Sequence, residues 1–268
     1  MSPSAELVAG YATAPSTTIT ALTLSDSAVT LTTRGQPGVT VAYLLPPWAD
    51  SQTAGILRLM APSWHDFVNG LYLNTVASEV RMLSTIGWKQ TLQGQEAISA
   101  GISGSATAGD LEMGVLPILY DNLEGISPSY IDVATLLERQ VGQVIAVPNT
   151  ITTGTAGAWA SEAINAEVDN FKSDLDYAVL GYQTTAECLA VAYQGVATGN
   201  LRWGGPGNET EKEFTGNYFI TMTQVYGRPL IPVFHGSDEG NFNVCVVIDE
   251  NGADPAISTI LAPLRRVN

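Results

Sequence analysis

Short runs of alternating polar and apolar residues, separated by Gly, Pro, Ser and Asp, fill most of this chain. Thr17–Leu24 alternates throughout, and Ala28–Thr33 alternates again after a Ser-Asp-Ser turn. A period of two is typical of strands that bury one face of a sheet. The pattern therefore predicts about a dozen strands, which is well above the usual strand content of a globular protein.

The remaining predicted strands have the same length and punctuation: Thr40–Leu44, Ala54–Met60, Gly70–Val76, Glu79–Thr85, Leu111–Tyr120, Val141–Val147, Asp176–Gln183, Glu187–Gln194, Asn217–Val225, Leu230–Phe234, Asn241–Asp249 and Ile257–Leu261. Pro117 lies inside a long apolar run. It predicts an edge position or a bulge there, because proline cannot donate a ladder hydrogen bond. The strands on either side of Thr184-Thr185 are expected to pair with each other.

Two segments have helical periodicity instead. Ser127 can cap a helix and Pro128 suits its first position, so a helix is expected over Pro128–Gln140. A second short helix is expected over Ser161–Phe171, where apolar residues recur at i, i+4 and i+7. With at most three short helices, the fold class is all-β: a β-barrel or sandwich.

The sequence suggests a domain boundary near Gly125, where a Gly/Ser/Pro turn precedes the first predicted helix. We therefore expect a first β-barrel or half over residues 17–125 and a second over 126–268, with a single domain over 17–268 as the alternative. No internal sequence repeat relates the two parts. Residues 1–16 are Pro/Ala/Ser-rich and low in charge, which is typical of an arm that orders only on a neighbour.

Composition indicates what surrounds this chain. Eleven basic residues against 26 acidic ones give a net charge of −15, yet only 14% of residues are charged, below the roughly 25% usual for soluble domains. An acidic chain without a basic stripe repels phosphate groups, so no direct nucleic-acid binding is expected. The low charge predicts a surface that copies of the same chain cover.

Two nearly uncharged loops suit such contacts between subunits, Ser99–Gly109 and Asn149–Gly157. Placing Asp at Ala106 or at Ile151 is therefore expected to weaken assembly while leaving the fold intact. No apolar run approaches the roughly 20 residues of a membrane-spanning helix, and residues 1–10 lack the basic start of a signal peptide. Neither a transmembrane segment nor a signal peptide is expected.

The candidate chemistry is sparse. His65 beside Asp66 has no second metal ligand at helical spacing, and both are expected in a turn. The stretch Gly236–Glu239 could seat a hard cation such as calcium, but it lacks the EF-hand spacing, so a solvated hairpin loop is the preferred interpretation. Cys188 and Cys245 have no ligand spacing and are expected to be buried. No cofactor and no metal are predicted.

Two other functions stay open. A carboxylate-dependent hydrolase would use a pair of acidic residues, for which Glu112 and Asp176 are the best candidates. A carbohydrate-binding sandwich would use exposed aromatic platforms, with candidates Trp64, Trp88, Trp159 and Trp203, although most of these suit core or interface anchors better.

Five blocks scattered between residues 55 and 234 stand out together: Gly55–Met60, Ser63–Gly70, Asp176–Tyr182, Thr198–Gly207 and Gly227–Phe234. This series resembles virion shell proteins of the jelly-roll kind found in bacteriophages and other viruses. The resemblance implies a jelly-roll barrel or sandwich, built as one elaborated barrel or as a double jelly roll, in a major capsid subunit without catalytic residues.

A capsid subunit located in the virion would have copies of itself, as trimers, and other virion proteins as partners. The missing basic arm fits a shell that an internal membrane or other proteins separate from the genome. The residues expected to shape assembly or structural turns are Ser63, His65, Asp66, Asn69, Gly70, Asn200, Arg202, Gly204, Gly205, Pro206 and Gly207, together with Ala106 and Ile151. Gly204–Gly207 in particular is expected to be a sharp turn with several positive φ angles.

Overall fold

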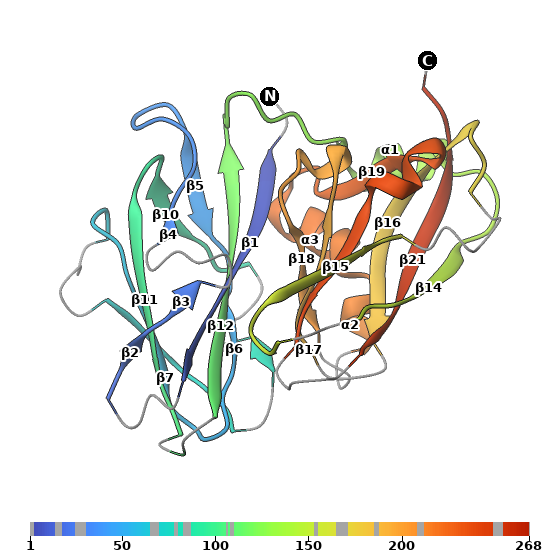
Figure 1. Cartoon of the computed structure of the whole chain (residues 1–268). Helices are drawn as coiled ribbons and strands as arrows, with labels where there is room; N and C mark the ends of the chain where they lie inside the picture. The colour runs from blue at the N-terminus through green and yellow to red at the C-terminus, as the bar shows by residue number, and fades with distance from the viewer. Residues whose placement is uncertain are drawn as a thin grey trace.

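The chain folds into four antiparallel sheets that stand side by side (Figure 1). The computed structural model describes residues 3–13, 18–24, 31–64, 70–77, 80–82, 87–105, 107, 110–152, 155–164, 171–184, 188–207, 212–248 and 254–267. Strands dominate and the helices are short, so the all-β fold class is confirmed.

Two sheets come from the N-terminal half. The outer N sheet has the order β2 (Thr20–Ala21), β11 (Ala97–Ser103), β7 (Ile56–Met60) and β8 (Leu71–Asn74), with β4 (Leu31–Thr32) also beside β11. The inner N sheet has the order β10 (Gln90–Gln93), β5 (Val41–Leu44), β12 (Leu111–Asp121), β1 (Ser4–Thr13) and β3 (Thr23–Leu24). In the inner N sheet, β6 (Trp48–Asp50) continues the β5 position along β12 and pairs with β9 (Arg81–Met82).

Two further sheets come from the C-terminal half. The inner C sheet has the order β15 (Trp159–Ala163), β20 (Asn243–Val247), β17 (Cys188–Gln194) and β18 (Trp203–Gly207). The outer C sheet has the order β13 (Tyr130–Ile131), β19 (Ile231–His235), β16 (Leu175–Thr184), β21 (Ala256–Arg265) and β14 (Ile145–Thr150). The helices are α1 (Val133–Arg139), α2 (Lys212–Gly216), α3 (Tyr218–Tyr226) and the 3₁₀ turns η1 (Val196–Thr198) and η3 (Gly236–Asn241).

The two halves repeat one strand order that their sequences do not reveal. In the C-terminal half we number β14 to β21 as positions 1 to 8; the outer C sheet then has the order 6-3-8-1 and the inner C sheet 2-7-4-5. In the N-terminal half the positions are β1, the broken strand β2–β4, β5 with β6, β7, β8, β9 with β10, β11 and β12. Its inner N sheet is again 6-3-8-1, with the β3 segment of position 2 added beside β1, and its outer N sheet is 2-7-4-5.

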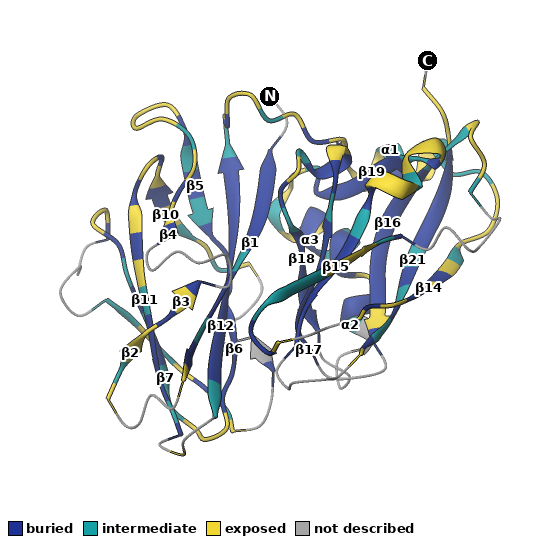
Figure 2. Cartoon of the chain, viewed as in Figure 1, coloured by how far each residue is buried: buried dark blue, intermediate teal, exposed yellow. Residues whose placement is uncertain are grey.

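Strands β1 and β12 form the centre of the inner N sheet and are buried on both faces (Figure 2). They pair from Ser4–Tyr120 to Thr13–Leu111. The expectation that residues 1–16 form an arm is therefore wrong for Ser4–Thr13, whose alternating Ala and Leu side chains belong to the core. Pro117 is also not at an edge: it lies where the neighbour of β12 changes from β5 to β6, and its carbonyl accepts from the Leu45 N–H at 2.9 Å.

The face of the inner N sheet that points away from the outer N sheet packs on the inner C sheet. Leu7 and Val115 belong to the core that the two halves share, whereas Ile118 lies in the separate core of the N-terminal half. On the other side of the junction, Tyr193 points into the C-terminal sandwich, where its hydroxyl bonds the Thr259 hydroxyl at 2.9 Å. Alternation then directs its neighbour Ala192 toward the N-terminal half, so small side chains let the sheets approach closely.

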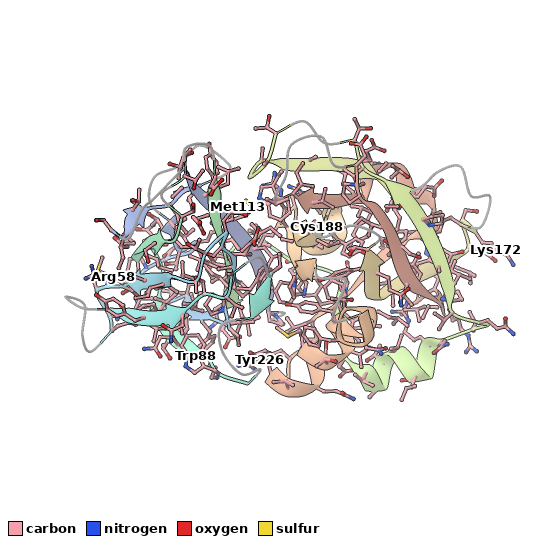
Figure 3. The ribbon with its side chains drawn as sticks, turned by 90° about the horizontal axis from the view of Figure 1, so that it is seen from below. Arg58, Trp88, Met113, Lys172, Cys188 and Tyr226 are labelled. Carbon is pink, nitrogen blue, oxygen red and sulfur yellow. The ribbon has the colours of Figure 1, made fainter. Side chains whose placement is uncertain are left out.

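Polar contacts fix this junction at several points. The Trp48 indole Nε1 donates to the Leu189 carbonyl at 2.6 Å, and the Leu7 N–H donates to the Arg202 carbonyl at 2.6 Å. At another edge the Tyr226 hydroxyl donates to the Trp88 carbonyl at 3.2 Å (Figure 3). The halves are thus joined by buried apolar surface and by directional bonds together.

Helix α1 is shorter than the sequence predicts. The helix begins after Asp132, whose carboxylate accepts from the Thr135 N–H at 2.7 Å, and it ends at Arg139. Tyr130 and Ile131, which were expected inside the helix, instead pair with β19 as strand β13. Asp132 therefore takes the capping role that Ser127 was expected to have, because Asp is an equally good N-cap residue.

The Asp132→Ala variant is expected to lose about 1 kcal/mol of folding free energy at neutral pH, because the Thr135 N–H loses its cap. That hydrogen bond lowers the pKa of the Asp132 carboxyl. A lowered folded pKa gives a contribution that is present above the unfolded pKa and is lost as the pH falls through the folded value. Thermal melts should therefore separate wild type and variant at neutral pH but converge in acid; an equal difference at both would contradict this role. Asp132→Asn is the control that keeps the cap without titrating.

Two other predictions of secondary structure are wrong, one of a helix and one of a strand. Ser161–Ala163 belongs to strand β15, while residues 165–170 lie outside the described part of the chain. Conversely, the predicted strand Asn217–Val225 is mostly helix α3, which buries Tyr218, Phe219, Met222 and Thr223 on one side. The i, i+4 spacing of these residues favours a helix, and Gly227, at φ +61°, supplies the left-handed C-cap. The aromatic and β-branched residues had favoured a strand.

The strands on either side of Thr184-Thr185 do not pair with each other. Strand β16 belongs to the outer C sheet and β17 to the inner C sheet, so the chain crosses the sandwich between them. Ser99–Ser103, expected in a loop, is part of β11 and pairs with β7. Small residues fit in that strand because its neighbours approach closely at Gly101.

Gly204–Gly207 is a buried strand, not a turn with positive φ angles. A Cβ at Gly204 would lie 2.0 Å from the Val191 carbonyl oxygen, and one at Gly205 would lie 2.4 Å from the Tyr218 ring. The glycines are therefore needed for the close approach of β18 to β17 and α3. The positive φ angles occur just before, at Gly199 and Asn200.

The Gly204→Ala variant is expected to lose about 2–3 kcal/mol of folding free energy, because the new methyl group meets rigid backbone. Gly240→Ala is the matched control, since no atom lies within 4 Å of a Cβ at Gly240. Urea unfolding followed by tryptophan fluorescence measures both. Equal stability of the two variants would contradict the close packing of β18.

Candidate functional site

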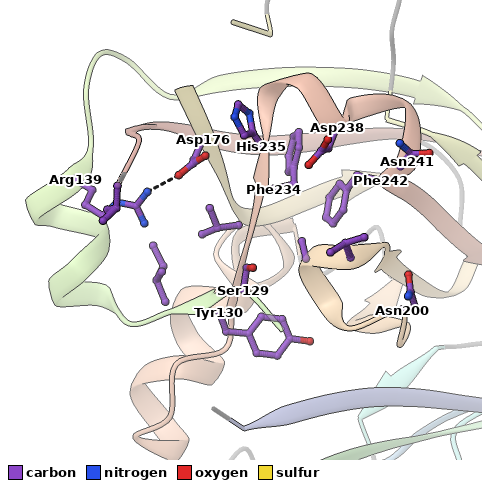
Figure 4. A pocket seen from close by; sticks show the side chains of 15 residues that line it. Ser129, Tyr130, Arg139, Asp176, Asn200, Phe234, His235, Asp238, Asn241 and Phe242 are labelled. Carbon is purple, nitrogen blue, oxygen red and sulfur yellow. Dashed lines mark hydrogen bonds and ion pairs between the residues drawn. The ribbon is translucent and has the colours of Figure 1, made fainter. Parts of the chain in front are cut away.

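A cleft with a volume of about 650 Å³ lies beside strand β19 in the C-terminal half (Figure 4). The β19 edge contributes one wall, because β13 pairs with it only at Ile231 and Pro232. The lining comes from β13, α1, β16, η1, β19 and η3 and their flanking residues: Ser129, Tyr130, Ile131, Arg139, Asp176, Val196, Ala197, Asn200, Val233, Phe234, His235, Asp238, Asn241, Phe242 and Val267.

An ion pair forms the polar end of this cleft. Arg139, in the last turn of α1, donates from Nη2 to the Asp176 carboxylate at 2.6 Å. The same guanidinium donates to the Arg265 carbonyl, from Nε at 3.1 Å and from Nη2 at 2.9 Å. Both charged side chains are about 85% buried, with 15% and 16% of their area exposed. The pair is thus held in one geometry and presents a fixed dipole to the cleft.

His235 stands next to this ion pair because β16 and β19 pair Asp176 with His235. The imidazole Nδ1 accepts from the Ser237 N–H at 3.2 Å, which closes the start of η3. Ser129 lines the same cleft, so a serine, a histidine and an aspartate share it. However, Asp176 bonds Arg139 and His235 Nδ1 bonds Ser237, whereas a Ser-His-Asp triad needs the aspartate on Nδ1.

The rest of the cleft is amphipathic. Val196 and Val267 at its rim are 73% and 69% exposed, whereas Phe242 at its base is buried. Burial raises the pKa of Tyr130, so its phenol stays protonated at ordinary pH. Asn200, Asp238 and Asn241 add amide and carboxylate groups to the walls. The arrangement suits a neutral polar ligand with apolar parts.

A second, smaller groove of about 450 Å³ lies between the two halves. Glu6 is buried at its wall and accepts from Arg34 Nε at 2.8 Å and from the Tyr120 hydroxyl. Burial and the Glu6 charge raise the pKa of Tyr120. Arg202, from the C-terminal half, lines the other side, and its guanidinium lies 5.0 Å from the centre of the Trp159 ring. These contacts each lie within one half, and the Leu7 N–H bond to the Arg202 carbonyl at 2.6 Å links the two sides of the groove.

The predicted turn residues do not gather in one place. Ser63 donates its N–H to the Glu96 carboxylate in the N-terminal half, and Gly70, at φ +75°, precedes β8. Asn200 follows η1 and lines both clefts. His65, Asp66, Asn69 and Ala106 lie outside the described residues. Ile151 is fully buried in the core of the single chain, so its predicted role as a subunit contact is wrong.

The tryptophans are mostly anchors. Trp203 and Trp64 are buried, and their indole N–H groups donate to the Leu230 and Thr91 carbonyls at 3.0 and 3.1 Å. Trp159 and Trp88 are half-buried. The preferred interpretation as core anchors is therefore confirmed for Trp64 and Trp203, and the alternative of exposed platforms is wrong for these two, because their rings fill the two cores.

The two candidate carboxylates are not brought together. Glu112, on β12 in the N-terminal half, is fully buried and accepts from the Ser105 N–H at 2.7 Å and from the Gln52 N–H at 3.2 Å. Asp176 lies on β16 in the C-terminal half. Glu112 thus holds a corner of its own sandwich and is absent from the cleft lining.

The stretch Gly236–Glu239 forms the start of the 3₁₀ turn η3 and not a hairpin loop. Within the described part of the chain, no group of three or more His, Cys, Asp or Glu side chains is placed to hold a metal ion. Arg139, Asn241 and the β19 edge were not singled out by sequence reasoning. The basic residue in the last turn of α1 was the available signal for Arg139.

No described helix is both long enough and apolar enough to cross a membrane. No protein-family model and no curated protein matches this chain. Eight chains of solved structures match. One, the phage PBSX exported protein XepA, is 12% identical; the match covers 97% of this chain and 86% of that chain, with a TM-score of 0.27. A TM-score this low carries no argument about fold or function.

Proposed function

We propose that this chain is a structural subunit of a virus capsid that assembles with copies of itself into the virion shell, without catalysis. The observation that carries the proposal is the strand order. The sheet orders 6-3-8-1 and 2-7-4-5, found in both halves of the chain, support a jelly-roll interpretation. Jelly rolls build viral capsids, lectins and cupins. The charged fraction of only 14% favours the capsid among these, because it fits a surface that copies of the same chain cover.

Charge supports the same proposal. Six of the eleven basic side chains are already engaged within the chain: Arg34, Arg139 and Arg228 in ion pairs, and Arg58, Lys89 and Arg202 over aromatic rings. Few cations remain to bind a genome. The proposed partners are copies of the chain, in trimers, and other virion proteins, with a membrane or another protein layer between this shell and the genome.

Negative-stain electron microscopy of the purified full chain tests this function. We expect closed oligomers at low concentration and curved sheets or shells at high concentration. A gel shift with RNA and DNA at physiological salt should show no complex. A chain that stays monomeric at every concentration would overturn the capsid proposal.

The cleft beside β19 favours one alternative, a carbohydrate-binding sandwich. Lectins share the jelly roll, and Asn200, Asp238 and Asn241 supply the amide and carboxylate groups that sugar hydroxyls use. A glycan array tests this alternative. Binding that is lost in Asn241→Ala but kept in Leu137→Ala, on the exposed side of α1, would support it.

A further inference from the structure

The stack of four sheets ends in two outer surfaces, and the C-terminal one is covered. A Cβ at Gly181 on β16 would lie 2.3 Å from the Thr215 carbonyl oxygen, so the α2 backbone lies directly against the outer C sheet. On the same side, a Cβ at Gly216 of α2 would lie 3.5 Å from Cδ1 of Ile260, the β21 residue that pairs with Gly181. Helix α2 therefore covers the centre of this face.

The N-terminal end has no such cover among the described helices, all of which belong to the C-terminal half (Figure 1). Leu57 and Leu59 of β7 are fully buried in the core, so alternation turns Ile56, Arg58 and Met60 outward. The strand register places Tyr72 beside Arg58 and Ser99 beside Met60 on the same side. Figure 3 shows Arg58 on the side away from the C-terminal half.

This outer surface of the outer N sheet, defined by Ile56, Arg58, Met60, Tyr72, Asn74, Ala97 and Ser99, is unusually neutral for a chain of charge −15. Arg58 is the charged residue among these seven, and its guanidinium lies 5.4 Å from the centre of the Tyr72 ring. Tyr72 is 47% exposed. A flat face with a half-exposed aromatic ring, a stacked arginine and half-buried aliphatic groups has the composition of a protein interface.

The internal repeat indicates what such a face does. The inner C sheet has the same 2-7-4-5 order as the outer N sheet, and its equivalent face is buried against the inner N sheet. That contact joins a 2-7-4-5 face to a 6-3-8-1 face. On a second copy, the 6-3-8-1 face of the N-terminal half is already used and that of the C-terminal half is covered by helices. A second copy therefore offers no open 6-3-8-1 face to this 2-7-4-5 face, so copies of the chain cannot stack head to tail in the way the two halves do.

We propose that two copies of this chain pair through their outer N sheets about a two-fold axis. The face that no described helix covers on one copy then meets the same face of the other, which is the isologous contact of most dimers. The inference rests on the proposed function and deepens it. A shell needs one contact that closes an oligomer and another that joins oligomers, and this face supplies the joining contact.

Size-exclusion chromatography with light scattering on the full chain tests the pairing. Tyr72→Lys and Ser99→Arg should each raise the dissociation constant of the two-fold contact at least about tenfold. Each adds a positive charge to a face that already carries Arg58, and the two-fold axis sets these charges against their own copies. Leu137→Lys is the matched control, a positive charge placed at a 70% exposed position on α1 in the C-terminal half. It should leave the mass unchanged.

Cysteine cross-linking tests the symmetry. Single Tyr72→Cys and Ser99→Cys variants, treated with a flexible bis-maleimide reagent, should give covalently linked dimers, because residues that lie near a two-fold axis are within reach of their own copies. Wild type should give none, since Cys188 and Cys245 are buried. If the variants assemble like wild type and form no cross-links, the pairing is wrong while the capsid function stands. If wild type itself never assembles, the capsid function fails as well.

Discussion

The Trp48→Ala variant is expected to separate the unfolding of the two halves and to lower the free energy of unfolding by about 3–5 kcal/mol, the usual cost of truncating a buried Trp. Trp48 is fully buried in the shared core, and its indole bridges to the Leu189 carbonyl of the other half at 2.6 Å. Truncation leaves both a cavity and an unpaired carbonyl at the junction. Differential scanning calorimetry should then show two transitions where wild type shows one.

Trp48→Phe is the control, because it keeps most of the apolar volume and loses only the hydrogen bond. It should cost about 1 kcal/mol beyond its smaller size and keep a single transition. Trp64→Ala removes an indole from the N-terminal core instead. If it divides the transition as strongly as Trp48→Ala does, the junction is not what couples the halves.

Alternation along the chain was sufficient to predict an all-β fold, because each sandwich buries one face of most strands. It could not predict which strands pair. The strands on either side of Thr184-Thr185 are close in sequence and similar in pattern, yet they lie in opposite sheets. Pairing depends on contacts between residues far apart in the chain, and local propensity carries little information about them.

The repeat of the strand order in the two halves is also not visible as a repeat in the sequence. Position 1 is the buried strand β1 in one half and the half-exposed edge strand β14 in the other. The same position therefore needs Ala and Leu in the first half and tolerates Pro148 in the second. Different neighbours on the outer faces change the residues while the backbone order stays the same.

Glycine was the most ambiguous residue type. The run from Gly204 to Gly207 suggested a turn, since glycine often supplies positive φ angles. The structure uses these glycines for close contact with Val191, Tyr218 and Cys188. The two uses cannot be distinguished without knowing that a strand and a helix cross at this point.

The candidate cleft was only partly predictable. Asp176 and His235 were singled out separately, but only the β16–β19 register brings them together. Arg139 reaches them because α1 ends over Asp176, six residues after it begins at Val133. The helix boundary, which depends on the Asp132 cap, therefore decides where the guanidinium lies, and sequence patterns locate such boundaries poorly.

The Ile151→Asp variant is expected to unfold the chain rather than weaken its assembly. Ile151 is fully buried next to the end of β14, and its N–H donates to the Pro255 carbonyl at 3.1 Å. A carboxylate there lies in the shared core without a cation to pair with, which costs about 3–5 kcal/mol. Loss of the buried Ile151 side chain adds a cost of about 2–5 kcal/mol. A typical domain has about 5–15 kcal/mol of stability in all, so much of the variant should be unfolded.

Thr150→Asp is the matched control, because the neighbouring side chain is exposed at the edge strand β14. It should keep the stability of wild type within about 0.5 kcal/mol. Circular dichroism melts and light scattering on the same samples separate folding from assembly. Loss of the β signal and of the melting transition in Ile151→Asp alone would support the core role. A variant that melts like wild type but no longer associates would instead restore Ile151 to a contact between subunits.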